Sequence, residues 1–136
     1  MHDIWVTDLM TREVTTCKAD TLLTDVVKML HTEKFSCLVV IKDETPVGII
    51  TERDMVTILA DMLADVSWDS LSVENFMSTD PITIMEDHTL FEAVDIIREE
   101  GIRHAPVINR ENKLIGLLTQ TDIINGLYQA AVLEEA

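Results

Sequence analysis

The sequence has few of the features that mark a secreted, membrane-spanning or metal-binding protein. It contains only two cysteines, Cys17 and Cys37, and neither belongs to a cluster of cysteines or histidines with metal spacing. No apolar run approaches the roughly 18 residues that a membrane span needs. The chain starts without a basic segment followed by an apolar stretch. We therefore expect an unexported, cytoplasmic protein with reduced core cysteines and no membrane partner.

Basic residues are also scarce. The chain has 10 lysines and arginines against 25 acidic residues, a formal net charge of −15. Binding to polymeric nucleic acid depends on neutralising backbone phosphates, so we expect no nucleic-acid partner. A small anionic ligand remains compatible with this charge, because physiological salt screens exposed acids beyond about 8 Å while a few local donors still act.

No set of residues typical of an active site is present. The four histidines, His2, His31, His88 and His104, lie in different predicted elements, and no His-x-x-x-His or His-Glu-x-x-His motif occurs. The acidic residues on predicted helices fit solvated faces better than a catalytic pair. We expect the protein not to be an enzyme and to require no cofactor.

What the chain does contain is an internal repeat. Its 136 residues, 47% of them apolar, suit one compact globular module. A shift of 68 positions superposes Thr15 on Thr83, Thr21-Leu22 on Thr89-Leu90, Val26 on Val94, Val39 on Val107, Gly48 on Gly116, Thr51 on Thr119 and Asp54 on Asp122. A shift of 67 aligns a short lead-in, with Val6, Leu9 and Met10 on Val73, Phe76 and Met77. A duplication, with repeats at 1–68 and 69–136, is the simplest account.

Each repeat predicts the same β-α-β-β-α order, and the fold class is α+β. The predicted strands are 14–17, 37–41 and 47–50 in the first repeat and 82–85, 105–108 and 114–118 in the second. The second predicted helices run over 53–63 and 121–133. Thr89 and Glu92 form a capping box before the first helix of the second repeat, and Gly101 ends that helix. Two small sheets with helices on one side should pack face to face as a pseudo-twofold pair.

The most informative segments are Gly48–Asp54 and Gly116–Asp122, each of which runs from a buried strand into a helix. The glycine allows close approach of a ligand or another backbone, and the helix N-terminus presents free N–H groups to an anion. Thr51 and Thr119 could then bond a phosphate, while Asp54 and Asp122 could accept from both hydroxyls of a ribose. The alternative is that Thr-x-x-Asp is only a capping box. The two interpretations are compatible.

Together these motifs resemble a known family. The tandem units, the lead-ins, Ala105-Pro106-Val107-Ile108 and the two Gly-h-h-Thr-x-x-Asp segments (h, hydrophobic) look like a pair of cystathionine β-synthase (CBS) domains, the Bateman module. The resemblance implies clefts between the units that bind AMP, ADP, ATP, S-adenosylmethionine or related ligands. It places ribose hydroxyls on Asp54 and Asp122 and the ribose-phosphate on Thr51 and Thr119. The early strands, with Val14, Thr15 and Thr16 in the first and Ile82 and Thr83 in the second, would line the adenine pocket.

A second segment with chemistry is Gly101–Val107, which places Arg103 and His104 before a strand that continues with Ala105 and Pro106. By the same resemblance, basic residues at this place contact phosphate. We hypothesise that Arg103 and His104 bind the phosphate of the nucleotide whose ribose Asp54 holds. Lys34 would do the same for the other cleft. The alternatives are a solvated arginine and a core or surface histidine.

The two halves are not equivalent in this alignment. Glu33 aligns with Gly101, and a phosphate near Glu33 would be repelled unless Lys34 or a metal such as Mg²⁺ offset it. We therefore expect one cleft, and not both, to bind a nucleotide strongly.

Two partners follow from the resemblance. One is a second copy, contacted through apolar residues of the second helices: Met55, Ile58, Met62, Ile123, Ile124 and Leu127. The other is an effector protein that the sequence does not name. The rival function is a purely structural, dimerising module whose Thr-x-x-Asp pairs only cap helices.

Overall fold

The computed structural model of the chain describes residues 3–33, 35, 37–64 and 70–135, without the side chains of residues 62, 64 and 133–135. The chain forms two compact units. The central unit is Thr15–Pro81, and the terminal unit combines Met1–Val14 with Ile82–Ala136. None of the helices in these ranges has both the length and the hydropathy of a membrane span.

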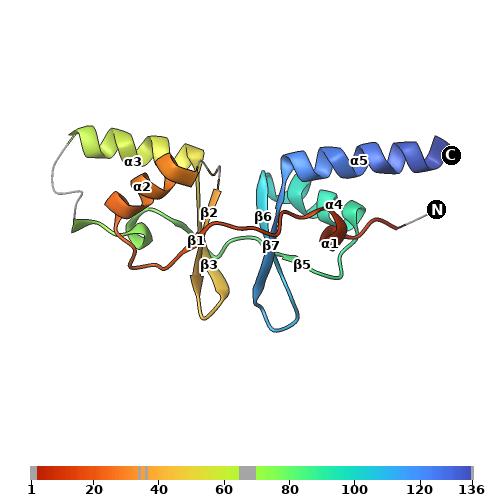
Figure 1. Cartoon of the computed structure of the whole chain (residues 1–136), viewed down its shortest axis with the longest axis horizontal. Helices are drawn as coiled ribbons and strands as arrows, with labels where there is room; N and C mark the ends of the chain where they lie inside the picture. Colours follow the sequence, from red (N-terminus) through yellow and green to blue (C-terminus); the bar gives the residue numbers. More distant parts are fainter. Residues whose placement is uncertain (1–2, 34, 36, 65–69, 136) are drawn as a thin grey trace. The chain divides into compact units, whose positions relative to one another are not determined.

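The central unit is a four-stranded sheet with helices (Figure 1). Its elements are β1 (Thr16–Cys17), α2 (Leu23–Glu33), β2 (Cys37–Lys42), β3 (Thr45–Thr51), α3 (Glu52–Ala64), the 3-10 helix η2 (Val73–Asn75) and β4 (Ser78–Thr79). The strand order is β1-β2-β3-β4, with β1 parallel to β2 and the other neighbours antiparallel. The predicted helices and the β2–β3 hairpin are confirmed. The predicted first strand, 14–17, is shorter, because only Thr16 and Cys17 pair with β2.

The terminal unit repeats this plan with a three-stranded sheet. Its elements are α1 (Val6–Leu9), β5 (Ile84–Met85), α4 (Leu90–Glu100), β6 (His104–Ile108), β7 (Leu114–Thr119) and α5 (Gln120–Glu135). The order β5-β6-β7 again joins a parallel pair to an antiparallel hairpin. The expected α+β fold with two small sheets is confirmed.

The lead-ins are exchanged between the repeats. In the terminal unit, the backbone of the first lead-in bonds to the start of α4, with Val6 N on His88 O (3.0 Å) and Leu90 N on Ile4 O (2.7 Å). In the central unit, Val73 N bonds to Thr21 O (2.8 Å). The lead-in of the first repeat therefore belongs to the terminal unit, with the strands of the second repeat. The lead-in of the second repeat belongs to the central unit, with the strands of the first repeat. The compact units therefore have other bounds than the sequence repeats 1–68 and 69–136.

Strand pairing also corrects the alignment of the two repeats. Val40 is opposite Gly48 in one hairpin, and Val107 is opposite Gly116 in the other. Because the second hairpin holds one more residue between these pairs, the repeats align at a shift of 67 before the turn and 68 after it. Cys37 therefore corresponds to His104, since both pair with the threonine that precedes a second helix. Glu33 then aligns with Glu100, and Gly101 with Lys34, which lies outside the described residues.

Two glycines of the motif have a packing role that the sequence did not reveal. A Cβ on Gly48 would meet Met77, with Cγ at 2.9 Å, and a Cβ on Gly116 would meet Met10, also with Cγ at 2.9 Å. Met10 and Met77 are equivalent lead-in residues. The close approach that these glycines allow is therefore made by a methionine of the packed lead-in.

The start and the end of α4 are as predicted. The Thr89 backbone N–H donates to Glu92 Oε1 (3.0 Å), the Thr89 hydroxyl donates to the same oxygen (3.0 Å), and Glu92 N–H donates to Thr89 Oγ1 (3.3 Å). Gly101 ends the helix with φ +66° in the left-handed region. The two Thr89 donors lower the pKa of Glu92 below its ordinary value, the backbone N–H having the larger effect.

This pKa shift predicts a pH dependence of the cap. A carboxyl whose pKa is lowered on folding stabilises the folded state above its unfolded pKa, and that contribution is lost as the pH falls through the folded value. An NMR titration should give Glu92 a pKa below that of an ordinary glutamate, and Thr89→Ala should move it part of the way back because the backbone donor remains. An unshifted Glu92 titration would contradict the cap.

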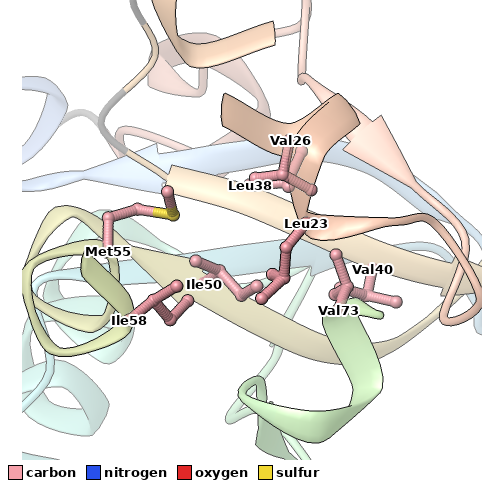
Figure 2. Packing of buried hydrophobic residues seen from close by; sticks show 8 residues of the cluster. All are labelled: Leu23, Val26, Leu38, Val40, Ile50, Met55, Ile58 and Val73. Atoms are coloured by element: carbon pink, nitrogen blue, oxygen red, sulfur yellow. The ribbon is translucent and has the colours of Figure 1, made fainter. Parts of the chain in front are cut away.

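The central unit has a core of buried side chains from both helices, the hairpin and η2 (Figure 2). Its members are Leu23, Val26, Leu38, Val40, Ile50, Met55, Ile58 and Val73. Met55 and Ile58 were expected on an exposed, dimerising surface, and that expectation was wrong, because they are 4% and 1% exposed. The outward apolar residues of α3 are instead Val56, Leu59 and Leu63. The terminal unit has its own core around Val6, Ile84, Ala93, Ala105, Val107 and Leu118.

Candidate functional site

Each unit carries one Thr-x-x-Asp corner, where its last hairpin strand passes into its last helix. In the central unit, Thr51 ends β3 and α3 begins at Glu52. In the terminal unit, Thr119 ends β7 and α5 begins at Gln120. The residue before each threonine, Ile50 in β3 and Leu118 in β7, is fully buried. This burial anchors the end of the strand, so the half-buried threonine and aspartate of each corner are held in place.

Both corners form the capping box that sequence reasoning left open. Thr51 donates to Asp54 Oδ2 through its backbone N–H (2.9 Å) and its hydroxyl (3.2 Å). Thr119 does the same to Asp122 Oδ2, at 2.9 Å for both donors. The aspartate N–H groups return bonds to the threonine hydroxyls at 3.5 Å and 3.2 Å. In each capping box the threonine donors bond to Oδ2 of the aspartate. These bonds fix the carboxylate at the helix start, so the orientation of Oδ1 is fixed as well.

The two corners differ in what else reaches the carboxylate. Thr11 of the first lead-in donates its hydroxyl to Asp122, at 3.2 Å from Oδ2 and 3.5 Å from Oδ1. Sequence reasoning missed Thr11, although its position after Met10, like Ser78 after Met77, marks it as part of the repeat.

The strand beside each corner also differs. Cys37 is paired with Thr51, and burial raises the pKa of its thiol to about 12, with the negative charge of Asp54 adding to the shift. In the terminal unit, His104 takes the place of Cys37 and is paired with Thr119. Burial also raises the pKa of Cys17, against a hydrogen bond from Thr21 that lowers it. Cys37 is buried as expected, whereas Cys17 is only half-buried, and both thiols are free.

The other predicted site residues are placed as follows. Val14, Thr15 and Thr16 are half-buried at the start of β1, and Ile82 and Thr83 are half-buried before β5. Arg103 is exposed and lies directly before β6, and His104, the first residue of β6, is half-buried. Ala105 and Pro106 are buried within β6, and Ala105 belongs to the core of its own unit. Lys34 lies outside the described residues.

The corners bring together hydroxyls, a carboxylate and helix N–H groups, which suit a ligand with hydroxyl and anionic parts. Among the described residues, no group of three or more His, Cys, Asp or Glu side chains is placed to hold a metal ion. These groups stand together at the start of α3 and of α5.

Comparison with known protein families agrees with the duplicated fold. The family model for the CBS domain matches the chain twice, at residues 6–61 and 73–129. The chain therefore belongs to the CBS-domain family, as a tandem CBS pair. An uncharacterized protein of Methanopyrus kandleri is 32% identical over 137 residues, which cover 99% of this chain and 69% of that protein.

Enzymes that contain this domain match only in part. Inosine-5'-monophosphate dehydrogenase of Thermoplasma acidophilum is 29% identical over 116 residues, or 85% of this chain but only 22% of the enzyme. The likeness is confined to the CBS portion, which is a regulatory domain, so it does not extend the enzyme's activity to this chain.

Solved structures share the whole fold. CBSX2 in complex with AMP superposes with a TM-score of 0.75 at 25% identity, covering 94% of this chain and 98% of that one. CBSX2 from Arabidopsis thaliana, in another structure, has a TM-score of 0.80 at 24% identity, covering 96% and 98%. The CBS domain pair of protein MJ0100, in complex with 5'-methylthioadenosine and S-adenosyl-L-methionine, has a TM-score of 0.79 at 21% identity, covering 96% and 99%. The last two likenesses concern the fold alone.

Proposed function

We propose that this CBS pair is a regulatory module that binds an adenine nucleotide, with the ribose hydroxyls donating to Asp54 and, more weakly, to Asp122. The observation that carries the proposal is the geometry of the Asp54 corner. Capping fixes the carboxylate through Oδ2, while Oδ1 accepts no hydrogen bond from any residue in the described part of the chain. An oriented carboxylate with an available oxygen suits a pair of neighbouring hydroxyls.

The proposal of an adenine nucleotide is supported by a solved structure of the same fold. AMP is bound by CBSX2, a chain of the same fold at 25% identity. In this proposal the corners recognise the ribose, which AMP, ADP, ATP and S-adenosylmethionine share, and the phosphate end would discriminate among them. Exposed Arg103 and half-buried His104 remain the proposed phosphate contacts, with Lys34 and Mg²⁺ as further proposals.

Thermal unfolding with separate ligands tests this proposal. AMP, ADP, ATP, S-adenosylmethionine and NAD should be compared with GMP and inorganic phosphate. A ligand at about a hundred times its Kd stabilises the folded state by about 2.7 kcal/mol, which is several degrees for a chain of this length. A shift with adenine ligands and not with GMP or phosphate would support the sensor. No shift with any of them would overturn it.

The second candidate is a structural module without nucleotide binding. The observation that favours it is the complete capping box at both corners, which accounts for Thr-x-x-Asp without a ligand. Substitution at Asp54 separates the two functions, because a cap and a ribose contact predict different effects on ligand affinity.

We further propose a cytoplasmic homodimer that signals to an effector protein. Exposed apolar side chains recur at equivalent places on the two last helices, with Val56 and Leu59 (66% and 44% exposed) matching Ile124 and Leu127 (60% and 43%) at the shift of 68. Large apolar groups repeated on exposed helix faces are typical of an interface. These residues replace Met55 and Ile58 in the expected dimer surface, and the side chain of Met62 lies outside the described part.

Sedimentation at tens of micromolar should show a dimer. The double substitution Leu59→Glu with Leu127→Glu should give monomer, because it places charges in an apolar interface. Phe91→Glu, at a 51% exposed site on α4, should leave the dimer intact. A parent protein that sediments only as monomer would overturn the dimer.

A further inference from the structure

The two proposed ribose carboxylates have different protein partners. Asp122 accepts from the Thr11 hydroxyl, at 3.2 Å and 3.5 Å from its two oxygens. Asp54 has no such partner among the described residues, although Ser78 stands at the equivalent place in the central unit. Thr11 and Ser78 follow the equivalent residues Met10 and Met77.

The position of Thr11 is set by the backbone. Its N–H donates to Leu117 O and its carbonyl accepts from Leu117 N–H, both at 2.8 Å. Ser78 is likewise paired with Ile49, the residue equivalent to Leu117. The backbones are therefore alike, and the difference lies in the side chain that reaches, or does not reach, the carboxylate.

A hydroxyl on Asp122 competes with the hydroxyls of a ligand. Asp122 Oδ2 already accepts from the Thr119 N–H and hydroxyl, and Thr11 is a third donor to it and a longer one to Oδ1. A ribose that uses this carboxylate must displace the Thr11 hydroxyl, so part of the binding energy replaces an existing hydrogen bond. At Asp54 no such exchange is needed.

We propose that Thr11 is a specificity-determining residue that weakens ribose binding at Asp122 and so makes Asp54 the first site to fill. This inference rests on the proposed function, since it assigns an order to the two ribose sites. The protein would then respond to a low nucleotide concentration through the central unit and to a higher one through the terminal unit.

Calorimetric titration with AMP tests this order. In the Asp54→Ala background only the Asp122 site remains, and adding Thr11→Val should tighten AMP binding about three- to tenfold by removing the competing donor. Valine keeps the shape of threonine and both backbone bonds to Leu117. Ser78→Ala in the Asp122→Ala background is the matched control and should leave the AMP affinity unchanged.

The outcomes separate this inference from the proposed function. If the parent does not bind AMP, both fail. If the parent binds AMP but Thr11→Val leaves the Asp54→Ala protein unchanged, or still without binding, only the role of Thr11 is overturned. A backbone amide NMR titration of the parent is a second test that needs no substitution. Amides at Thr51 and Asp54 should shift at lower AMP than those at Thr119 and Asp122, and the reverse order would overturn the inference.

Discussion

Asp54→Ala is expected to weaken AMP binding at its own site by about a hundredfold or more, measured in the Asp122→Ala background so that the second ribose site does not contribute. Two hydrogen bonds from ribose hydroxyls to a carboxylate contribute about 1.5 kcal/mol or more each, and about 3 kcal/mol corresponds to about a hundredfold in Kd. The same substitution removes the acid of the α3 capping box, so the free energy of unfolding should also fall by about 0.5–2 kcal/mol. Calorimetry and urea unfolding measure the two effects separately.

Glu92→Ala is the matched control for this experiment. Glu92 closes the same kind of capping box at the start of α4, where no ligand contact is proposed. Its removal should lower stability by a similar amount and leave the affinity for AMP unchanged. If adding Asp54→Ala to the Asp122→Ala protein left its affinity for AMP unchanged, the ribose assignment would be wrong. If Glu92→Ala lost as much affinity as Asp54→Ala, the loss would reflect stability and not contact.

Leu38→Ala is expected to have the largest effect on stability. Leu38 is fully buried in β2 and belongs to the core of the central unit, as Figure 2 shows. Truncating a buried leucine to alanine costs about 2–5 kcal/mol, because apolar contacts are lost and a cavity remains. Its equivalent at the shift of 67 is Ala105, also fully buried, so the terminal unit is packed around a smaller residue there.

Leu22→Ala supplies the comparison for Leu38→Ala within the same unit. Leu22 is 41% exposed, so its removal should cost less than about 1 kcal/mol. Urea unfolding should show a lower midpoint for Leu38→Ala with an unchanged slope. A cost below 1 kcal/mol at Leu38 would mean that the core of the central unit is not packed as described.

Local signals in the sequence predicted most elements correctly. The bounds of α4 depend on local preferences alone. Thr89 and Glu92 favour a capping box at its start, and Gly101 favours the left-handed conformation that ends it. The hairpins and second helices followed from alternation and helical periodicity in the same way. The Thr-x-x-Asp corners were found too, and their capping geometry is one of the two interpretations that the sequence left open.

The features that were missed depend on which distant segments meet. Nothing local in the first lead-in specifies that it packs with β7, so the contacts of Met10 with Gly116 and of Thr11 with Asp122 could not be derived. The alignment slipped by one residue because the longer second hairpin changes the shift inside a repeat, and apolar residues match at either shift.

The faces of α3 posed a different problem. The helix is apolar on two sides, with Met55 and Ile58 inward and Val56 and Leu59 outward, so periodicity alone could not decide which side is buried. Only the packing of Met55 and Ile58 with Leu38 and Ile50 settles it.

A crystal structure of the protein with AMP would locate the ribose relative to Asp54 and Asp122. We expect AMP at the start of α3, with its ribose hydroxyls within hydrogen-bond distance of the Asp54 carboxylate and with the cap between Asp54 and Thr51 intact. Crystals grown at saturating AMP that show no nucleotide, or that show it with its ribose away from both Asp54 and Asp122, would overturn ribose binding by these aspartates.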